Sequence, residues 1–464
     1  MRVLGISVLV VLFLAGCTGC PDKKGDKGTF TSVGTTVGGA SEAPPPSKGK
    51  DRWKADEKKG ESKKDADGKL DWKATAEAIK SREDAKPEAL VAAAPKAGWK
   101  KATPEPQSGR LTAGSFDDNL FPDAFRLLAS RMGQASSSGG LTSKLFGRRL
   151  IVTARGQDGR PLGNARVRVR GDGQQSVELT TRSDGRAVFV SSWDNVDGDL
   201  TVTVTPPDGS AAVTQPVDRE TLRCEVSLPT AAAPLPKNLD LVLVLDTTGS
   251  MGDELAYLKS EIRSIARDVA AKFPHVSQRY GLVVYRDRGD EYVTRTFNLS
   301  APLDDFRRNL GDQTAAGGGD YPEAMEVGLE EAVKVQWCSA DTARVVFLVA
   351  DAPPHAKDIP RAMNAADALR KKGVAIYPLA CSGYDEACEL VMRSCAMLTG
   401  SQFLFLTDDS GVGEAHAEPH IPFYRVERQA SLMVRMVTSE LSGRHLEPAA
   451  EEILRTVGTP PKVQ

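Results

Sequence analysis

From residue 239 onward, continuous apolar runs of strand length alternate with amphipathic stretches of helix length. The apolar runs include LDLVLVL at 239–245, RVVFLVA at 344–350 and GVAIYPLA at 373–380. Runs of this kind are typical of strands that are buried on both faces. Their alternation with helices predicts a doubly wound, Rossmann-like α/β domain with a parallel sheet, and the sequence bounds this domain at 239–443. The last predicted helix is FYRVERQASLMVRMVTSEL at 423–441, and residues 444–464 are then a tail.

The N-terminus carries an apolar segment that is too short to cross a bilayer, which needs about 20 residues. It ends in Leu14-Ala15-Gly16-Cys17, which resembles a bacterial lipobox. The resemblance implies a signal peptide at 1–16, lipidation of Cys17 and a lipid-anchored protein of the bacterial cell envelope, periplasmic or surface-facing. Thr18 stands where inner-membrane lipoproteins usually carry Asp, which favours the outer membrane. An ordinary signal peptide with a coincidental cysteine is the alternative.

Two segments follow that have no long, regular pattern of apolar residues. Residues 17–110 are rich in Gly, Pro and mixed charge, which predicts a disordered tether, since such a segment buries too little apolar surface to fold. Its tryptophans could instead be docking anchors for a partner. Residues 111–147 predict a short helical segment, introduced by Asp117 and Asp118, and then a flexible break. The tryptophans are Trp53, Trp72 and Trp99.

Residues 148–229 alternate apolar and polar side chains over several short runs, with Asp-Gly turn signals between the runs. This pattern predicts a small antiparallel β-sandwich, followed by a Pro-rich linker at 230–238. The phrases DGRPLGNARVRV and TTRSDGRAVFV resemble the carboxypeptidase-regulatory-like, transthyretin-like family. The resemblance implies a spacer or stalk, with ligand binding as the alternative.

Cysteine spacing leaves room for disulfides in the C-terminal domain of an exported protein. Cys388 and Cys395 lie seven residues apart on a predicted helix, about 10 Å, which is too far for them to bond each other. We therefore expect Cys381 or Cys338 as a partner. The C-terminal domain contains no CxxC pair, so the sequence gives little support to a zinc site there.

Oxygen-bearing side chains gather where the first buried strand ends. Asp246, Thr248 and Ser250 alternate directly after LDLVLVL, so they can converge above the sheet edge, where open α/β sheets bind ligands. A carboxylate with two hydroxyls suits Mg²⁺, with Mn²⁺ or Ca²⁺ as alternatives. The competing interpretation is that Thr248 or Ser250 merely caps the following helix.

The segment DTTGSMGDEL resembles the metal-ion-dependent adhesion site of von Willebrand factor type A domains, whose first motif is Asp-x-Ser-x-Ser. Thr248 then replaces the first serine, and Asp351 in VADAPPH occupies the third motif, which binds the metal through water. The threonine of the second motif falls on Pro322, so we expect Asp320 as its substitute, with Thr314 as the alternative. The resemblance implies a metal-dependent protein-binding module whose partner completes the metal shell with a carboxylate.

Other function classes are less well supported. The 60 Lys and Arg nearly balance the 62 Asp and Glu, so there is no global basic field for nucleic acid. The segment HAEPH, with His416, Glu418 and His420, could hold a metal for hydrolysis or contact a partner, but a structural loop is the favoured interpretation. We expect no enzyme, because no nucleophile–base pair or cofactor motif is evident. A structural or assembly lipoprotein with a metal-free or purely structural domain is the alternative function.

Overall fold

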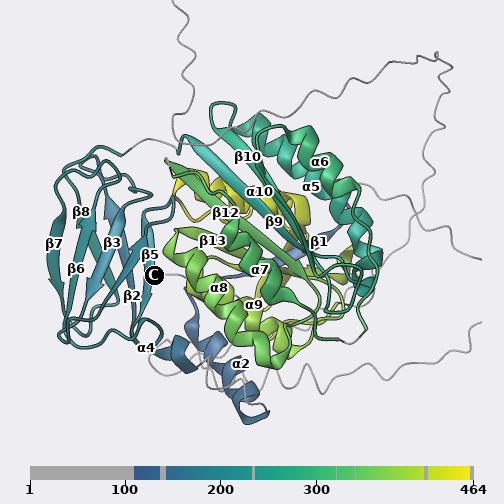
Figure 1. Cartoon of the computed structure of the whole chain (residues 1–464), viewed down its shortest axis with the longest axis horizontal. Coiled ribbons are helices and arrows are strands. Elements are labelled where there is room, and N and C mark those ends of the chain that lie inside the picture. Colours follow the sequence, from purple (N-terminus) through teal and green to yellow (C-terminus); the bar gives the residue numbers. More distant parts are fainter. Residues whose placement is uncertain are drawn as a thin grey trace, which may run out of the picture. The chain divides into compact units, whose positions relative to one another are not determined.

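The structure is a computed structural model of the chain, and Figure 1 shows its course. The predicted signal peptide, Cys17 and the predicted tether up to residue 108 lie outside the described residues, as does Asp320. No helix in the described part of the chain is long and apolar enough to cross a membrane. The described residues are 109–135, 143–232, 236–319, 321–339, 341–411 and 416–459.

A mixed nine-stranded sheet forms the centre of the α/β domain in the described residues. Five central strands run parallel, as the sequence predicts, because their apolar runs are buried on both faces. The prediction of a wholly parallel sheet is wrong, because β11, β1, β15 and β16 pair antiparallel. In sheet order the strands are β11 (Thr294–Ser300), β10 (Ser277–Tyr285), β9 (Asn238–Asp246), β12 (Thr342–Ala350), β13 (Val374–Ala380), β14 (Phe403–Thr407), β1 (Thr112–Phe116), β15 (Tyr424–Arg428) and β16 (Arg455–Val457).

Three of the antiparallel strands come from segments that the sequence assigns otherwise. β1 lies in the predicted helical segment, yet it enters the sheet between β14 and β15. At Gly114 in β1, an added Cβ would lie 2.4 Å from Cζ of Phe405, so the absence of a side chain lets the two strands pair closely. β15 lies in the stretch predicted as the start of the last helix, and β16 lies in the predicted tail.

Helices cover both faces of the sheet, because successive side chains along each strand point to opposite sides. Val242 and Val244 pack in one core, whereas Leu241, Leu243 and Leu245 pack in the other. The first core is covered by α2 (Pro122–Ala135), α7 (Met325–Lys334), α8 (Ile359–Lys371) and α9 (Glu386–Thr399); of these, α7, α8 and α9 lie in front of the sheet in Figure 1. The second core is covered by α5 (Gly252–Lys272), α6 (Leu303–Gly311) and α10 (Gln429–Ser442). Short 3-10 turns are η1 (Ser143–Phe146), η2 (Gly249–Met251), η3 (Ala356–Asp358), η4 (Asp408–Ser410) and η5 (Ala450–Glu452).

Residues 149–228 form a separate pair of sheets around one apolar core, and we call them the two-sheet unit. The alternation of buried and exposed residues along its strands follows the predicted period of two. The pairing is not purely antiparallel as predicted, because β2 and β8 run parallel. One sheet contains β5 (Arg186–Val190), β2 (Arg149–Arg155) and β8 (Arg223–Ser227), the other β4 (Ser176–Thr180), β3 (Arg166–Arg170), β6 (Leu200–Thr205) and β7 (Val213–Val217), and the short helix α4 (Ser191–Asp194) follows β5.

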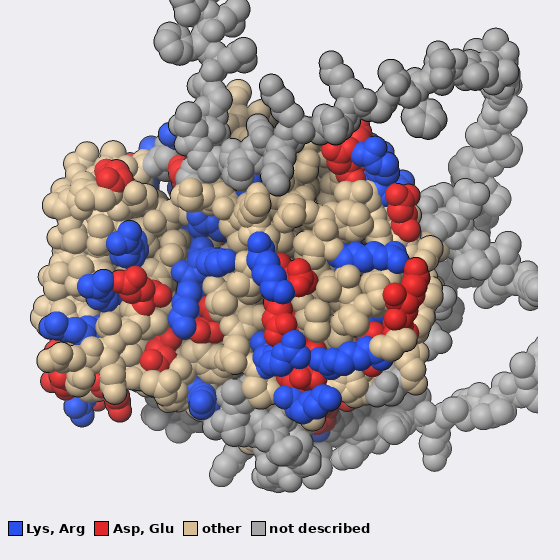
Figure 2. Space-filling model, viewed as in Figure 1, with Lys and Arg blue, Asp and Glu red and all other residues tan. Residues whose placement is uncertain are grey.

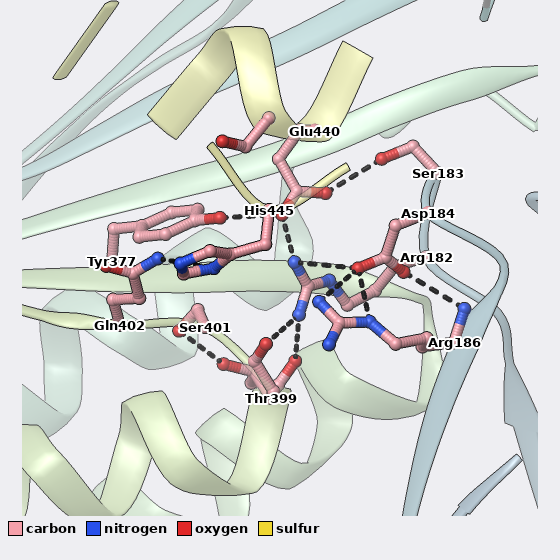
Figure 3. Close-up of polar contacts among 12 residues, drawn as sticks. Arg182, Ser183, Asp184, Arg186, Tyr377, Thr399, Ser401, Gln402, Glu440 and His445 are labelled. Atoms are coloured by element: carbon pink, nitrogen blue, oxygen red, sulfur yellow. Dashed lines mark hydrogen bonds and ion pairs between the residues drawn. The ribbon is translucent and has the colours of Figure 1, made fainter. Parts of the chain in front are cut away.

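Buried polar contacts join the two-sheet unit to the α/β domain. Figure 3 shows Arg182, in the loop between β4 and β5, pointing at Glu440 on α10. The second oxygen of Glu440 accepts a hydrogen bond from Ser183 Oγ at 2.7 Å, and Oε1 also accepts one from Tyr377 Oη at 2.7 Å. A second buried pair joins Arg370 of α8 to Asp194 of α4 at 3.1 Å between Nη1 and Oδ2. These contacts fix the unit against two helices of the domain.

The cysteines differ from the expectation. Cys381, Cys388 and Cys395 are free and buried, so Cys381 does not pair with either of the other two. Cys224 in the two-sheet unit is also free. Cys338 is disulfide-bonded, and its partner is none of these four.

Candidate metal centre

The predicted oxygen-bearing side chains meet at the carboxyl edge of the parallel strands. Asp246 is the last residue of β9, and Asp351 directly follows the neighbouring strand β12. Thr248 donates to Asp246 Oδ1 from both its backbone N, at 2.8 Å, and its Oγ1, at 2.7 Å. Thr248 Oγ1 lies 3.3 Å from Ser250 Oγ, and the side chain of Ser250 is close enough to Asp351 to oppose the rise in the pKa of that carboxyl. The structure therefore brings together four of the five side chains predicted from the sequence.

A fifth oxygen-bearing side chain at this edge is Glu323, which was not among the residues predicted from the sequence. The loop approaches Thr248 so closely that a Cβ on Gly318 would lie 2.7 Å from Glu323 Oε1 and 3.1 Å from Thr248 Cβ. The backbone N of Glu323 also donates to the carbonyl of Pro353, at 3.0 Å, which ties this loop to the one that follows β12. Thr314, the alternative ligand, is exposed, and its carbonyl accepts a hydrogen bond from Arg286.

A carboxylate immediately after Pro322 was the signal that could have identified Glu323. The family alignment placed the expected threonine on Pro322, one residue short of this side chain. Whether Asp320 also contributes is a prediction that lies outside the described residues.

The carboxylates of this centre are buried and incompletely paired. Asp246 is 0% exposed, and its Oδ2, together with Asp351 Oδ1 and Glu323 Oε2, has no hydrogen-bond partner among the described residues. Burial, followed by the charge of Asp351, raises the pKa of Asp246 to about 7. Burial raises the pKa of Asp351 to about 6, and burial with the charges of Asp246 and its neighbours raises that of Glu323 to about 9. Unpaired buried carboxylates are costly, so this arrangement suits a cation.

The donor set fits a hard divalent ion. In the described residues, no three His, Cys, Asp or Glu side chains converge closely enough to hold an ion by themselves. An ion here would therefore depend on the hydroxyls of Thr248 and Ser250 and on water, in addition to the carboxylates. All of these ligands are oxygens, which is the set that Mg²⁺, Mn²⁺ and Ca²⁺ prefer and that soft metals do not.

The HAEPH segment does not form a second metal site. His416 Nε2 lies 2.9 Å from Glu254 Oε1, and its Nδ1 lies 2.8 Å from Asp408 Oδ1. His420 instead contacts Glu389 on α9, and Glu418 accepts from Tyr424 Oη. The three side chains thus turn to separate partners, and the hydrolase interpretation of this segment loses its geometric basis.

Glu254 links His416 to the edge of the metal centre. Its Oε1 accepts from the backbone N of Ser382 at 3.0 Å and from Ser382 Oγ at 2.6 Å, whereas Oε2 has no partner. The charge of Glu254 also raises the pKa of Asp351, after burial. Burial lowers the pKa of His416, but the hydrogen bonds to Glu254 and Asp408 outweigh it and raise the pKa above its ordinary value.

His355, in the loop that follows β12, contacts the acidic loop that follows β10. Its Nε2 lies 2.9 Å from Asp287 Oδ1, and the same acidic loop reaches the glycine loop, since Gly318 N donates to Asp290 Oδ2 at 2.9 Å. Gly317 and Gly318 both have positive φ, a conformation that permits this tight turn.

A cavity of about 480 Å³ lies at the other edge of the sheet and is separate from this centre. Phe116 lines it and pairs with the first residue of β14, which places the cavity near the amino ends of the parallel strands. Two of its cations are already engaged, Arg435 with Glu427 and Arg425 with Glu447. The polar groups of the described residues therefore favour the carboxyl edge of the parallel strands, rather than this cavity, as the functional site.

Comparison with known proteins agrees with this assignment of the fold. Residues 240–402 match the family model of the von Willebrand factor A domain, so the chain contains a domain of this class. Domains of this class mediate protein–protein interactions and commonly bind a divalent metal at the adhesion site. The two-sheet unit lies outside the matched range.

The curated relatives share only the domain. The chain is 26% identical over 186 residues to a putative ariadne-like RING finger protein of Acanthamoeba polyphaga mimivirus, covering 36% of this chain and 18% of that protein. It is 30% identical over 133 residues to the alpha-protein kinase vwkA of Dictyostelium discoideum, covering 28% and 21%. The chain thus spans about a fifth of the length of these relatives.

Solved structures with similar folds include a conserved hypothetical protein BatB from Bacteroides thetaiotaomicron, with a TM-score of 0.30, 11% identity, and coverage of 44% of this chain and 98% of that chain. Another is a proximal thread matrix protein of the mussel byssus with a zinc-occupied adhesion-site motif, with a TM-score of 0.27, 19% identity, and coverage of 35% and 39%.

Proposed function

We propose that this protein is a membrane-anchored, metal-dependent protein-binding module. Its von Willebrand factor A domain would hold Mg²⁺ through Asp246, Thr248, Ser250, Glu323 and Asp351. When bound, the ion supplies a Lewis-acidic position that accepts a carboxylate from an Asp or Glu of the partner. Binding would therefore be sensitive to chelators, and the role is adhesion or assembly rather than catalysis.

The observation that carries this proposal is the set of unpaired carboxylate oxygens at one edge of the sheet. Asp246, Asp351 and Glu323 each keep one buried oxygen without a hydrogen-bond partner. Two neighbouring hydroxyls, on Thr248 and Ser250, lie on the same side. A purely structural loop would be expected to satisfy such groups internally, because an unpaired buried acceptor costs about 1–3 kcal/mol.

The remaining parts of the proposal rest on sequence. The Leu-Ala-Gly-Cys motif supports lipidation of Cys17 and a place in the bacterial cell envelope, in the outer membrane rather than the inner. The carboxypeptidase-regulatory-like phrases support the assignment of the two-sheet unit to that family. We propose that this unit raises the metal-binding domain above the tether as a stalk.

A structural or assembly role without metal is the second candidate. The raised pKa values of Asp246 and Glu323, about 7 and about 9, favour it, because protonated acids need no cation. In that case the loops that carry Asp246, Glu323 and Asp351 would keep their conformation when a chelator is added.

Thermal melting of the full chain tests the choice. We would measure the wild type, Asp246→Ala and the control Asp268→Ala in EDTA and with titrated Mg²⁺, Mn²⁺ and Ca²⁺. Asp268 lies on α5 with 47% of its side chain exposed. A saturable rise in melting temperature for wild type and control, absent in Asp246→Ala, supports the metal site, because a ligand that binds only the native state stabilises it. No rise for any ion in the folded wild type would favour the metal-free scaffold.

A further inference from the structure

Tyr321 presents an exposed aromatic ring directly beside the metal centre. The residue is 42% exposed, although it lies two positions before the buried Glu323. Its hydroxyl is fixed by two other loops at this edge: it donates toward the carbonyl oxygens of Asp351, at 3.3 Å, and Gly383, at 3.4 Å, and accepts from the backbone N of Asp385 at 2.7 Å. The phenol thus joins three loops, while part of the residue remains exposed to solvent.

A ring held in this way is well suited to recognition. Aromatic side chains that are already immobilised lose little conformational entropy when a partner packs on them, and Tyr is enriched among the residues that dominate binding energy. The other large apolar side chains that are exposed in the described residues, Leu222 and Leu454, lie on the two-sheet unit and near β16. Of these three side chains, Tyr321 is the one that contacts the loop of a candidate metal ligand.

The charges at this edge restrict the partner further. Aspartates lie in the loops after β10, β13 and β14, and the nearby cations Arg286 and Arg288 are engaged within the chain. A partner with several carboxylates would meet like charge here, which disfavours binding. These aspartates are Asp290 and Asp385, together with Asp287 and Asp408, which contact His355 and His416. On the face seen in Figure 2, by contrast, acidic and basic side chains are interspersed.

We infer that Tyr321 selects a protein segment in which a single Asp or Glu is adjacent to an aromatic or large apolar side chain. The carboxylate would occupy the open metal position, and the neighbouring side chain would pack on the exposed ring of Tyr321. Acidic residues next to the coordinating one would be rejected by the aspartates of the rim. This inference rests on the proposed function, since it assigns a preference to the same site.

Three short peptides test the preference with the Mg²⁺-loaded full chain. Ac-Gly-Asp-Gly-NH2 supplies the carboxylate alone, Ac-Phe-Asp-Gly-NH2 adds the aromatic side chain, and Ac-Asp-Asp-Gly-NH2 adds a second acid. Dissociation constants would be measured by ligand-observed NMR with Mg²⁺ and with EDTA. An aromatic contact corresponds to roughly a two- to tenfold change in dissociation constant. We expect the Phe peptide to bind more tightly than the Gly peptide by this factor, and the Asp-Asp peptide to bind more weakly than either.

Substitution of the ring separates the inference from the proposed function. In Tyr321→Ala the Phe and Gly peptides should bind equally, and their affinities are compared at saturating Mg²⁺ so that a weaker metal site does not enter the ratio. Tyr321→Phe retains the ring and should retain the preference, which guards against a loop disturbed by removal of the side chain. Leu222→Ala is the matched control, because it removes an exposed apolar side chain of the two-sheet unit.

The peptide measurements distinguish failure of the role of Tyr321 from failure of the proposed function. A wild type that does not distinguish the Phe from the Gly peptide, or a preference that survives Tyr321→Ala, overturns the role of Tyr321 while Mg²⁺-dependent capture of the Gly peptide still supports the proposed function. If none of the peptides binds better with Mg²⁺ than with EDTA, both proposals fail.

Discussion

Arg182 and Glu440 lie 258 residues apart in the chain and form a buried ion pair. Their side chains are 6% and 2% exposed. Burial alone would lower the pKa of Arg182, but the charges of Asp184 and Glu440 raise it above its ordinary value, so the guanidinium stays charged. The pair therefore joins the two-sheet unit to α10 by a contact that is lost if the two parts separate.

Removal of Glu440 should destabilise the whole described body. Glu440→Ala leaves the buried Arg182 with Asp184, at 3.4 Å, as its remaining carboxylate, and loss of one partner of a buried pair typically costs about 3–5 kcal/mol. Urea unfolding of the full chain would measure it. Glu225→Ala is the control, since Glu225 pairs with Arg155 while 57% exposed, and an exposed pair contributes less than about 1 kcal/mol. The double variant Arg182→Met with Glu440→Leu should recover most of the loss. If Glu440→Ala and Glu225→Ala lowered the free energy of unfolding equally, the buried pair would not stabilise the interface in this way.

Glu323 should be required for stabilisation by Mg²⁺, whereas Thr314 should not. At a Mg²⁺ concentration of 100 times the dissociation constant, the wild type should gain about 2.7 kcal/mol. Glu323→Ala should lose this gain and melt in EDTA no lower than the wild type, because it removes a carboxylate that is costly to bury. Melting curves with and without Mg²⁺ measure both effects.

Two further variants complete this comparison. Thr314→Ala should respond to Mg²⁺ as the wild type does, and Asp320→Ala asks whether the residue predicted from the sequence contributes as well. A Thr314→Ala chain that no longer responds, beside a Glu323→Ala chain that does, would show that the ligand has been assigned to the wrong residue.

His416 should stabilise the fold chiefly at low pH. Burial lowers its pKa, yet the bonds to Glu254 and Asp408 raise it overall, so the folded state binds the proton more tightly than the unfolded chain. The contribution is then complete below the ordinary value of about 6.5 and disappears as pH rises through the raised pKa. We expect His416→Gln to cost about 1–3 kcal/mol at pH 5.5 and less at pH 8.5, measured by urea unfolding.

A matched control is available for this pH dependence. His275 is exposed in the turn between α5 and β10, so His275→Gln should show no such trend. A cost of His416→Gln that is constant with pH would show that the imidazole acts in its neutral form.

Gly328 should not tolerate a side chain, although it lies within a helix. A Cβ at this position of α7 would lie 2.7 Å from Cδ1 of Tyr285 and 3.0 Å from Cγ1 of Val244. Gly328→Ala should therefore cost about 1–3 kcal/mol by overpacking, although alanine is the better helix former by about 1 kcal/mol. At Gly252, the first residue of α5, the nearest atom to an added Cβ is 4.0 Å away, so Gly252→Ala should be close to neutral. Thermal melting distinguishes the two, and a stabilised Gly328→Ala would contradict the close packing.

Strands whose apolar pattern is visible in the local sequence could be predicted. Strands that form only because they pair with residues far away in the chain could not. The buried runs that became β9, β12 and β13 have no polar face, so their strand character is local. β1 is a strand because β14 and β15 flank it, and a window around Thr112 carries no sign of residues near 407 or 428. The same limit applies to β15, whose apolar residues continue the helical pattern of α10.

The residues of the candidate site also fall into two groups, those that the local sequence predicts and those that depend on the fold. Asp246, Thr248 and Ser250 follow one strand at fixed spacing, so their convergence could be read from order alone. The identity of the residue from the glycine loop depends on how that loop folds back, which brings Gly318 close to both Glu323 and Thr248. The spacing of a motif defined in other chains could not show this turn.

The position of β1 has a consequence for the order in which the chain can fold during synthesis. Thr112 Oγ1 bonds the carbonyl of Thr407, 295 residues later, so β1 leaves the ribosome long before its neighbours exist. The intervening two-sheet unit contains its own apolar core and can form meanwhile. The nascent sheet stays incomplete until β14 and β15 emerge, and a gene fragment that starts at β9 would encode a sheet with a missing strand between them.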